Sequence, residues 1–143
     1  MSISITKFFQ GCVYVLGMSL VATSPALSLT AADGIFTPEQ AERGKAAYEA
    51  NCATCHGLDL VATISEASNL TGGSFNFAWQ RQTVNERFER ISTTMPPGRQ
   101  GQLSDQEYLD IIAYILSFNG YKPGQTELTK DVLSAETIPV GKP

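Results

Sequence analysis

Two cysteines and a histidine lie within five consecutive residues, Cys52-Ala53-Thr54-Cys55-His56. Cysteines spaced i, i+3 place both thiols on one face of a helical turn, and a histidine that follows directly can bind a metal through a ring nitrogen. This spacing is typical of c-type haem attachment, in which each thiol adds to a vinyl group of the porphyrin. We therefore predict that Cys52 and Cys55 hold one haem c covalently and that His56 ligates its iron.

Other uses of a cysteine pair fit less well. The third cysteine, Cys12, lies in a leader that we expect to be removed, which leaves two cysteines and one histidine. A structural zinc site needs four ligands. A thioredoxin-like pair needs a βαβ setting, and no strand-like run precedes Cys52. A structural disulfide remains as an alternative, against which the adjacent His56 argues.

The first thirty residues have the pattern of a secretory signal. Lys7 precedes an apolar run over about residues 8–22, and small residues follow it. We predict that residues 1–28 are a cleaved signal peptide, with cleavage somewhere between residues 26 and 32, and that the mature protein is periplasmic without a permanent membrane anchor. An uncleaved anchor is the alternative, but the run is shorter than the about 20 residues that a bilayer requires.

The net charge of the chain indicates which class of partner it can bind. Ten Lys and Arg stand against fourteen Asp and Glu, a formal net charge of −4 that becomes more negative when Lys7 is removed. An acidic chain is a poor ligand for nucleic acid. It is steered instead toward basic patches on partner proteins.

Hydrophobic periodicity predicts an all-α fold with no convincing strand. A first helix runs from residue 38 to about residue 51, with Thr37 as N-cap, Pro38 in the first turn and Gln40 closing a capping box. A second capping box opens a short helix at Thr83, and a third opens a long helix at residues 105–118.

Two helix faces carry specific predictions. Gly44 and Tyr48 share a face of the first helix, where the small residue favours close approach of another helix; a merely tolerated glycine is the alternative. In the second helix Val84 and Phe88 face the core, and Arg87 is expected to face water.

The sixth ligand of the iron is predicted by counting the histidines and methionines of the chain. His56 is the only histidine, so a second histidine from this chain is excluded. Met1 and Met18 fall in the leader, which leaves Met95, 39 residues after His56 in a Met-Pro-Pro-Gly loop. Most methionines fill cores, but Pro96 and its neighbour stiffen this loop. We predict that Met95 is the second axial ligand, which raises the reduction potential relative to a second imidazole.

Three segments without periodicity complete the chain. Residues 58–73 predict a loop whose carbonyls can accept a hydrogen bond from His56. Trp79 either packs in the core or donates its indole N–H to a haem propionate. Residues 121–143 predict an extended surface tail, which is either disordered or packed through its apolar residues.

The motif at Cys52, the face of Gly44 and Tyr48, Met95 with its prolines, and the helix at residues 109–116 resemble class I mono-haem cytochromes c. The resemblance implies a cytochrome c fold over residues 37–120, a small helical bundle wrapped around one covalent haem c. It also implies that the first and last helices cross at near right angles and that Gly44 and Tyr48 meet Tyr114.

The resemblance adds details of the site. Leu70 and Pro96 are expected to contact the haem, and Ser68 stands where the family commonly has a proline whose carbonyl holds the proximal histidine. Residues 114–121 and the tail are similar to cytochromes that accept electrons from periplasmic quinoprotein dehydrogenases.

These features predict a one-electron carrier, not an enzyme, with redox proteins as partners. Its expected donor is a periplasmic dehydrogenase, such as a quinoprotein, and its expected acceptor is a terminal oxidase or another cytochrome. One alternative is a dedicated haem subunit of a dehydrogenase complex, docked through the tail. Another is a haem protein that binds or reduces a small ligand after Met95 dissociates.

Overall fold

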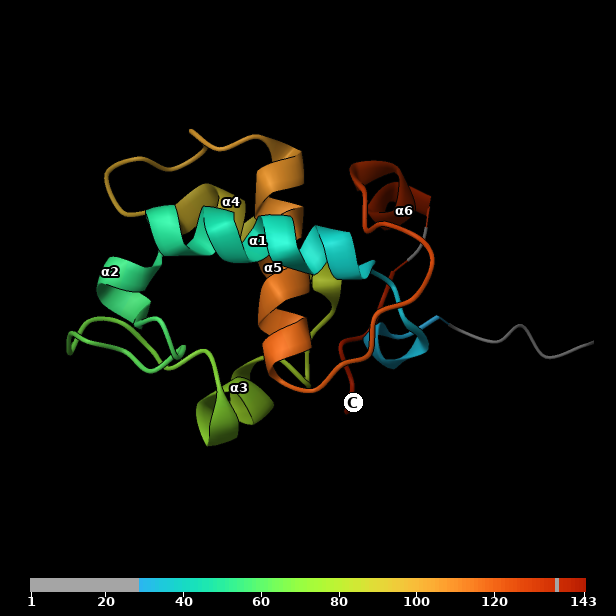
Figure 1. Ribbon diagram of the computed structural model, residues 1–143, viewed down its shortest axis with the longest axis horizontal. Coiled ribbons are helices and arrows are strands. Elements are labelled where there is room, and N and C mark those ends of the chain that lie inside the picture. Colours follow the sequence, from blue (N-terminus) through green and yellow to red (C-terminus); the bar gives the residue numbers. More distant parts are fainter. Residues whose placement is uncertain (1–28, 136) are drawn as a thin grey trace, which may run out of the picture.

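The computed structural model describes residues 29–135 and 137–143 (Figure 1), and the predicted signal peptide lies outside them. The elements are the 3-10 turn η1 (Ala31–Asp33) and the helices α1 (Pro38–Asn51), α2 (Ala53–His56), α3 (Gly72–Ala78), α4 (Val84–Thr94), α5 (Asp105–Phe118) and α6 (Lys130–Ala135). The described part contains no strand beyond an isolated bridge between Thr83 and Pro139, so the predicted all-α class is confirmed. None of its helices has both the length and the apolar character of a membrane span.

The local start signals of the helices are present. Thr37 accepts a hydrogen bond from the Gln40 backbone N–H at 3.1 Å. The capping boxes of α4 and α5 are complete, and the hydrogen bonds donated by the N–H and hydroxyl of Thr83 lower the pKa of Glu86. The box predicted at Thr37 is only half formed, because the Gln40 side chain is buried elsewhere.

α1 runs across α5 at the centre of the molecule (Figure 1). At Gly44 the two backbones are so close that an added Cβ atom would lie 1.7 Å from the carbonyl oxygen of Asp110. One turn further on, the rings of Tyr48 and Tyr114 pack with centroids 5.2 Å apart. The predicted close approach and its aromatic contact are therefore both confirmed.

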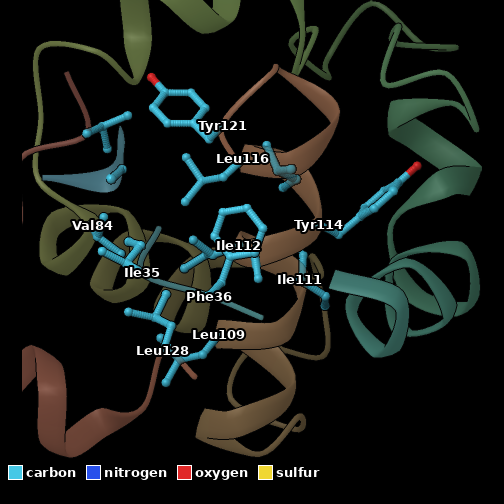
Figure 2. Close-up of a cluster of buried hydrophobic side chains, with 14 of the residues drawn as sticks. Ile35, Phe36, Val84, Leu109, Ile111, Ile112, Tyr114, Leu116, Tyr121 and Leu128 are labelled. Atoms are coloured by element: carbon cyan, nitrogen blue, oxygen red, sulfur yellow. The ribbon is translucent and has the colours of Figure 1, made fainter. Parts of the chain in front are cut away.

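α5 is enclosed over most of its length, since every residue from Tyr108 to Leu116 is buried. Figure 2 shows Ile35 and Phe36 from the segment before α1, and Tyr121 and Leu128 from the segment after α5, gathered around this helix. Because apolar residues occupy most of the surface of α5 between Tyr108 and Leu116, the helix requires such enclosure. The core is thus completed by residues near both ends of the described chain.

The predicted C-terminal tail is not extended throughout, because it contains a short helix. After α5 the chain forms α6 and packs on the domain; residues 121–135 and 137–143 are called the C-terminal strap below. Leu128, Ile138 and Val140 are fully buried. The backbone N–H of Val84 donates to Ile138 at 2.7 Å, and that of Val140 donates to Gln82 at 2.9 Å. Of the two alternatives for this segment, packing is the one observed.

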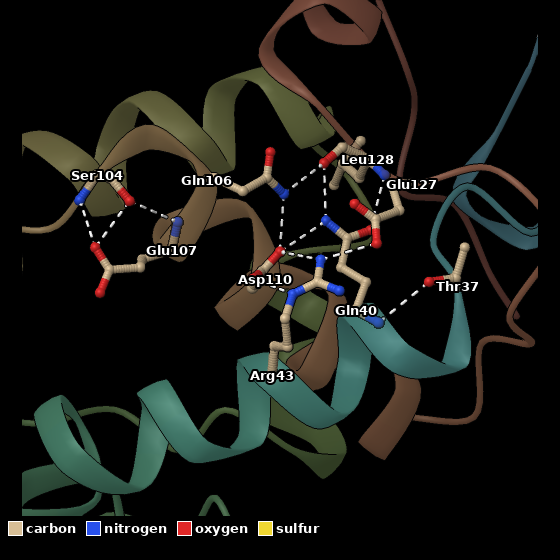
Figure 3. Close-up of polar contacts among 9 residues, drawn as sticks. All are labelled: Thr37, Gln40, Arg43, Ser104, Gln106, Glu107, Asp110, Glu127 and Leu128. Carbon is tan, nitrogen blue, oxygen red and sulfur yellow. Dashed lines mark hydrogen bonds and ion pairs between the residues drawn. The ribbon is translucent and has the colours of Figure 1, made fainter.

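A buried polar cluster links α1, α5 and the strap (Figure 3). Asp110, only 6% exposed, accepts hydrogen bonds from Gln40 at 3.0 Å, Gln106 at 2.8 Å and Arg43 at 3.0 Å. Gln40 also donates to the Leu128 carbonyl and accepts from its N–H. These hydrogen bonds satisfy the carboxylate and fasten the strap to the helix crossing.

Two further features differ from the sequence predictions. α3 was not predicted, because Gly72 and Gly73 disguise its first turn. Arg87 was expected in water but is only 8% exposed, with its guanidinium over the Trp79 ring at 5.3 Å and donating to the carbonyl of Ala78 and the side chain of Gln82. Burial lowers the pKa of Arg87.

We predict that Gly44→Ala destabilises the protein by at least the about 1–3 kcal/mol typical of overpacking, because the new methyl group meets backbone atoms that cannot rotate away. Urea unfolding measures the change. Gly73→Ala is the matched control, since a Cβ atom there meets nothing within 4 Å and its stability should be unchanged or slightly higher. Equal stability of the two variants would contradict the packing role of Gly44.

Candidate functional site

The two cysteines lie where α1 ends and α2 begins. The Cys52 N–H still donates to Tyr48 of α1 at 2.8 Å, and the Cys52 carbonyl accepts from the N–H groups of Cys55 and His56 at 3.1 and 3.0 Å. The predicted helical turn is therefore present. Both thiols are free and half-buried, so the structure does not contain the disulfide that remained as an alternative.

The Cys52 thiol is half-buried at the end of α1. Burial raises the pKa of Cys52 to about 11, and the positive charge of Arg99 partly opposes this shift. In Figure 1 the loop between α4 and α5 lies near the C-terminal end of α1, which leads into Cys52.

The His56 ring is oriented by the loop that follows it. Its Nδ1 lies 2.9 Å from the carbonyl oxygen of Ser68, as the family resemblance implied. With the proton on Nδ1 this contact is a hydrogen bond, and the lone pair of Nε2 is available for a metal. The carbonyl of Ser68 serves without the proline that the family commonly has at this position.

Two long-range hydrogen bonds fix the same region. The hydroxyl of Tyr48 donates to the carbonyl of Gly57, directly after His56, at 2.7 Å. Burial raises the pKa of Tyr48, so the phenol stays neutral and remains a donor. The side chain of Asn119 donates to the carbonyl of Leu70 at 2.9 Å and thereby ties the loop to the end of α5.

Met95 is the C-cap residue that follows α4, and it lies outside the buried core. It is half-buried, and its N–H donates to Ile91 at 2.9 Å. Its carbonyl accepts a hydrogen bond from the hydroxyl of Tyr108 at 2.8 Å. Pro96 beside it is buried. A methionine whose role is to fill a core would be more enclosed, so this position favours the alternative of a ligand.

Leu70 and Trp79, the remaining residues predicted to contact the haem, belong to the hydrophobic core or its edge. Leu70 is half-buried at the edge of the core. Trp79 is 3% exposed and stacks on Phe75 with centroids 5.2 Å apart, while Arg87 covers its ring. These contacts fit the core alternative for Trp79, and its contact with a haem propionate stays a prediction.

Sequence reasoning missed Tyr108 and Asn119. Both lie on or next to α5, whose periodicity predicted only apolar contacts. The available signal was the residue type, because a buried tyrosine usually needs a hydrogen-bond partner and an asparagine next to a helix end can donate to a neighbouring loop.

Comparison with known proteins agrees with this arrangement. The model of the family described as "Cytochrome C oxidase, cbb3-type, subunit III" matches residues 39–115, more than half of the chain. The chain belongs to the cytochrome c family.

A relative described as "Cytochrome c-553-like", from Synechocystis sp., is 32% identical over 76 residues, which cover 52% of this chain and 66% of the relative. The chain thus spans just under two thirds of the length of this curated relative. No solved structure matches the cytochrome.

Membership of this family implies a mono-haem class I cytochrome c. The residues present fit a haem c. Two free thiols share one turn, and the imidazole beside them is held through Nδ1 with Nε2 left for iron.

Proposed function

We propose that the cytochrome is a periplasmic one-electron carrier with one haem c, covalently bound through Cys52 and Cys55 and ligated by His56 and Met95. The observation that carries the proposal is the 2.9 Å contact between His56 Nδ1 and Ser68, next to two free thiols on the same turn. This arrangement presents a metal-binding nitrogen and two attachment points from one short segment.

A bound haem would supply an iron centre that can accept and release one electron. Two protein ligands that stay in place in both oxidation states keep the reorganisation small. The thioether of Met95 is a soft ligand that favours ferrous iron and raises the potential. Leu70 and Pro96 would contact the porphyrin, and Trp79 would donate to a propionate.

The partners are proposed from charge and from the resemblance. A net negative chain is steered toward basic docking surfaces, with an effect that weakens as salt rises. We propose a periplasmic dehydrogenase, such as a quinoprotein, as donor and a terminal oxidase or another cytochrome as acceptor. A brief encounter of this kind needs only a small interface.

The two alternatives gain little support. A dedicated subunit docked through the tail would need the apolar residues of the tail, but Leu128, Ile138 and Val140 are buried in the domain itself. A ligand-binding haem protein would need Met95 to leave easily, whereas the carbonyl of Met95 is hydrogen-bonded to Tyr108.

We propose residues 37–120 as the haem-binding domain, with the strap packed on it, and residues 1–28 as the cleaved signal. Thr30 donates to Asp33 through its N–H at 2.8 Å and its hydroxyl at 2.7 Å. Ala31 is fully buried and donates to Pro139 at 2.9 Å. Ala31 is thus packed against the strap, and Thr30 caps the turn η1 that begins with it, which favours cleavage before Thr30.

We therefore expect the mature protein to retain Thr30. The mass of the intact protein purified from the periplasm, with its haem, gives the first residue directly. A chain that begins at Asp33 would contradict this cleavage limit, and an unprocessed cytoplasmic chain would contradict export.

Cys55→Ser is predicted to leave no more than one thioether bond, because a serine hydroxyl does not replace the thiol in the addition to a vinyl group. The pyridine haemochrome spectrum and the mass of the denatured protein report the number of bonds. Thr54→Ala, at an exposed position between the cysteines, is the control and should keep both. Unchanged double attachment in Cys55→Ser would refute the assignment.

Met95→Ala is predicted to keep covalent haem but to lose the sulfur-to-iron charge-transfer band of the ferric protein. Because axial ligands shift haem potentials over a range of about 0.8 V, we expect a fall of roughly 0.1 V or more, and carbon monoxide should bind the ferrous form. Thr94→Ala, at the exposed neighbouring residue, should retain the wild-type spectrum. An unaltered band in Met95→Ala would exclude Met95 as ligand.

A further inference from the structure

Tyr108 is hydrogen-bonded to two points of the loop that begins at Met95 and leads into α5. It lies in the first turn of α5 and is 2% exposed. Its hydroxyl donates to the carbonyl of Met95 at 2.8 Å and accepts from the N–H of Gly101 at 3.1 Å. One phenol group thus satisfies two backbone groups that are six residues apart.

The rest of this loop has few ties to the core. Its backbone hydrogen bonds are short-range, from Arg99 to Pro96 at 2.9 Å and from Gln102 to Arg99 at 3.3 Å. Residues 97–102 are exposed. Pro96 is buried and Leu103 half-buried, which anchors the two ends by packing only. Tyr108 therefore provides the side-chain hydrogen bonds that hold the loop to a helix.

The helix that carries Tyr108 is rigidly placed. The capping box of Ser104 and Glu107 fixes its first turn, and the following residues are enclosed by the core. A hydroxyl on such a helix offers the loop a fixed reference point.

We propose that Tyr108 is a positioning residue for the distal ligand: it holds the Met95 backbone so that the thioether stays on the iron and resists displacement by outside ligands. The proposal rests on the assignment of Met95 as ligand. A thioether is neutral and exchangeable, so its retention depends on how firmly the backbone presents it. Loss of the hydrogen bonds of Tyr108 then favours a form of the loop in which the Met95 thioether has left the iron.

Imidazole is a suitable probe, because it binds ferric iron only where Met95 has left. The holoproteins of wild type, Tyr108→Phe, Tyr121→Phe and Met95→Ala are titrated with imidazole, and the charge-transfer band or the Soret band gives the Kd. We expect the Kd of Tyr108→Phe to be about three- to tenfold lower than that of wild type, the change expected for one or two net hydrogen bonds.

Tyr121→Phe is the matched control. Tyr121 is equally buried and also donates its hydroxyl to a backbone carbonyl, that of Gly141 in the strap. This variant should lose thermal stability to a similar extent and keep the wild-type Kd. If Tyr121→Phe lowers the Kd as much as Tyr108→Phe does, the effect is general destabilisation and the positioning role is overturned.

The remaining outcomes separate the two proposals. A lower Kd in Met95→Ala together with a wild-type Kd in Tyr108→Phe would overturn the role of Tyr108 alone. A wild-type Kd in Met95→Ala would overturn Met95 as ligand, and with it this inference.

A second measurement needs no variant. In the wild-type ferric protein, the amide of Gly101 should exchange slowly with solvent despite its exposed loop, because it is bonded to Tyr108. Saturating imidazole should release this protection. An amide that already exchanges at the rate of an open loop would overturn the proposal even if Tyr108→Phe failed to fold.

Discussion

Because residue 44 is a glycine, the backbone of α1 approaches that of α5 very closely. Even the methyl group of an alanine at this position would overlap the carbonyl oxygen of Asp110. Everything at the site is placed relative to this contact. α1 continues directly into Cys52 and α2, and its Tyr48 holds the segment after His56. α5 carries Tyr108, which is hydrogen-bonded to the loop that begins at Met95. The segments proposed to ligate the iron from both sides are thus fixed by hydroxyl groups from the two helices of one crossing.

The same crossing contains the buried carboxylate of Asp110. A buried charge is costly unless paired, and Asp110 is paired with Arg43 and hydrogen-bonded to two amides. Hydrogen bonding to Asp110 and then to Glu127 raises the pKa of Arg43, so its charge persists at any ordinary pH. Since Gln40 joins this cluster to Leu128, the strap completes the helix crossing as part of the folded domain.

Features encoded locally could be predicted from the sequence. The capping residues Thr37, Thr83 and Ser104 act within their own helices, so the starts of the main helices could be predicted from them. Features that depend on distant partners could not. Gln40 stands at a capping position, but its side chain is hydrogen-bonded to Asp110, 70 residues away. Arg87 stands at a position of α4 where a polar residue is expected to face water, but its guanidinium lies over the ring of Trp79. The order of the strap likewise depends on neighbours that its own composition does not reveal.

The two proposed axial ligands differ in how they are held. His56 is adjacent to a cysteine that would be covalently attached to the porphyrin. Its ring is hydrogen-bonded to the carbonyl of Ser68, and Tyr48 is hydrogen-bonded to the residue that follows it, Gly57. Met95 has no such covalent neighbour, and the hydrogen bond from Tyr108 reaches its backbone while leaving the thioether free. If one of the two proposed ligands gives way, we therefore expect it to be the thioether. On this proposal the rigidity of a single loop, more than the haem motif, would separate an electron carrier from a protein that binds small ligands at the same iron.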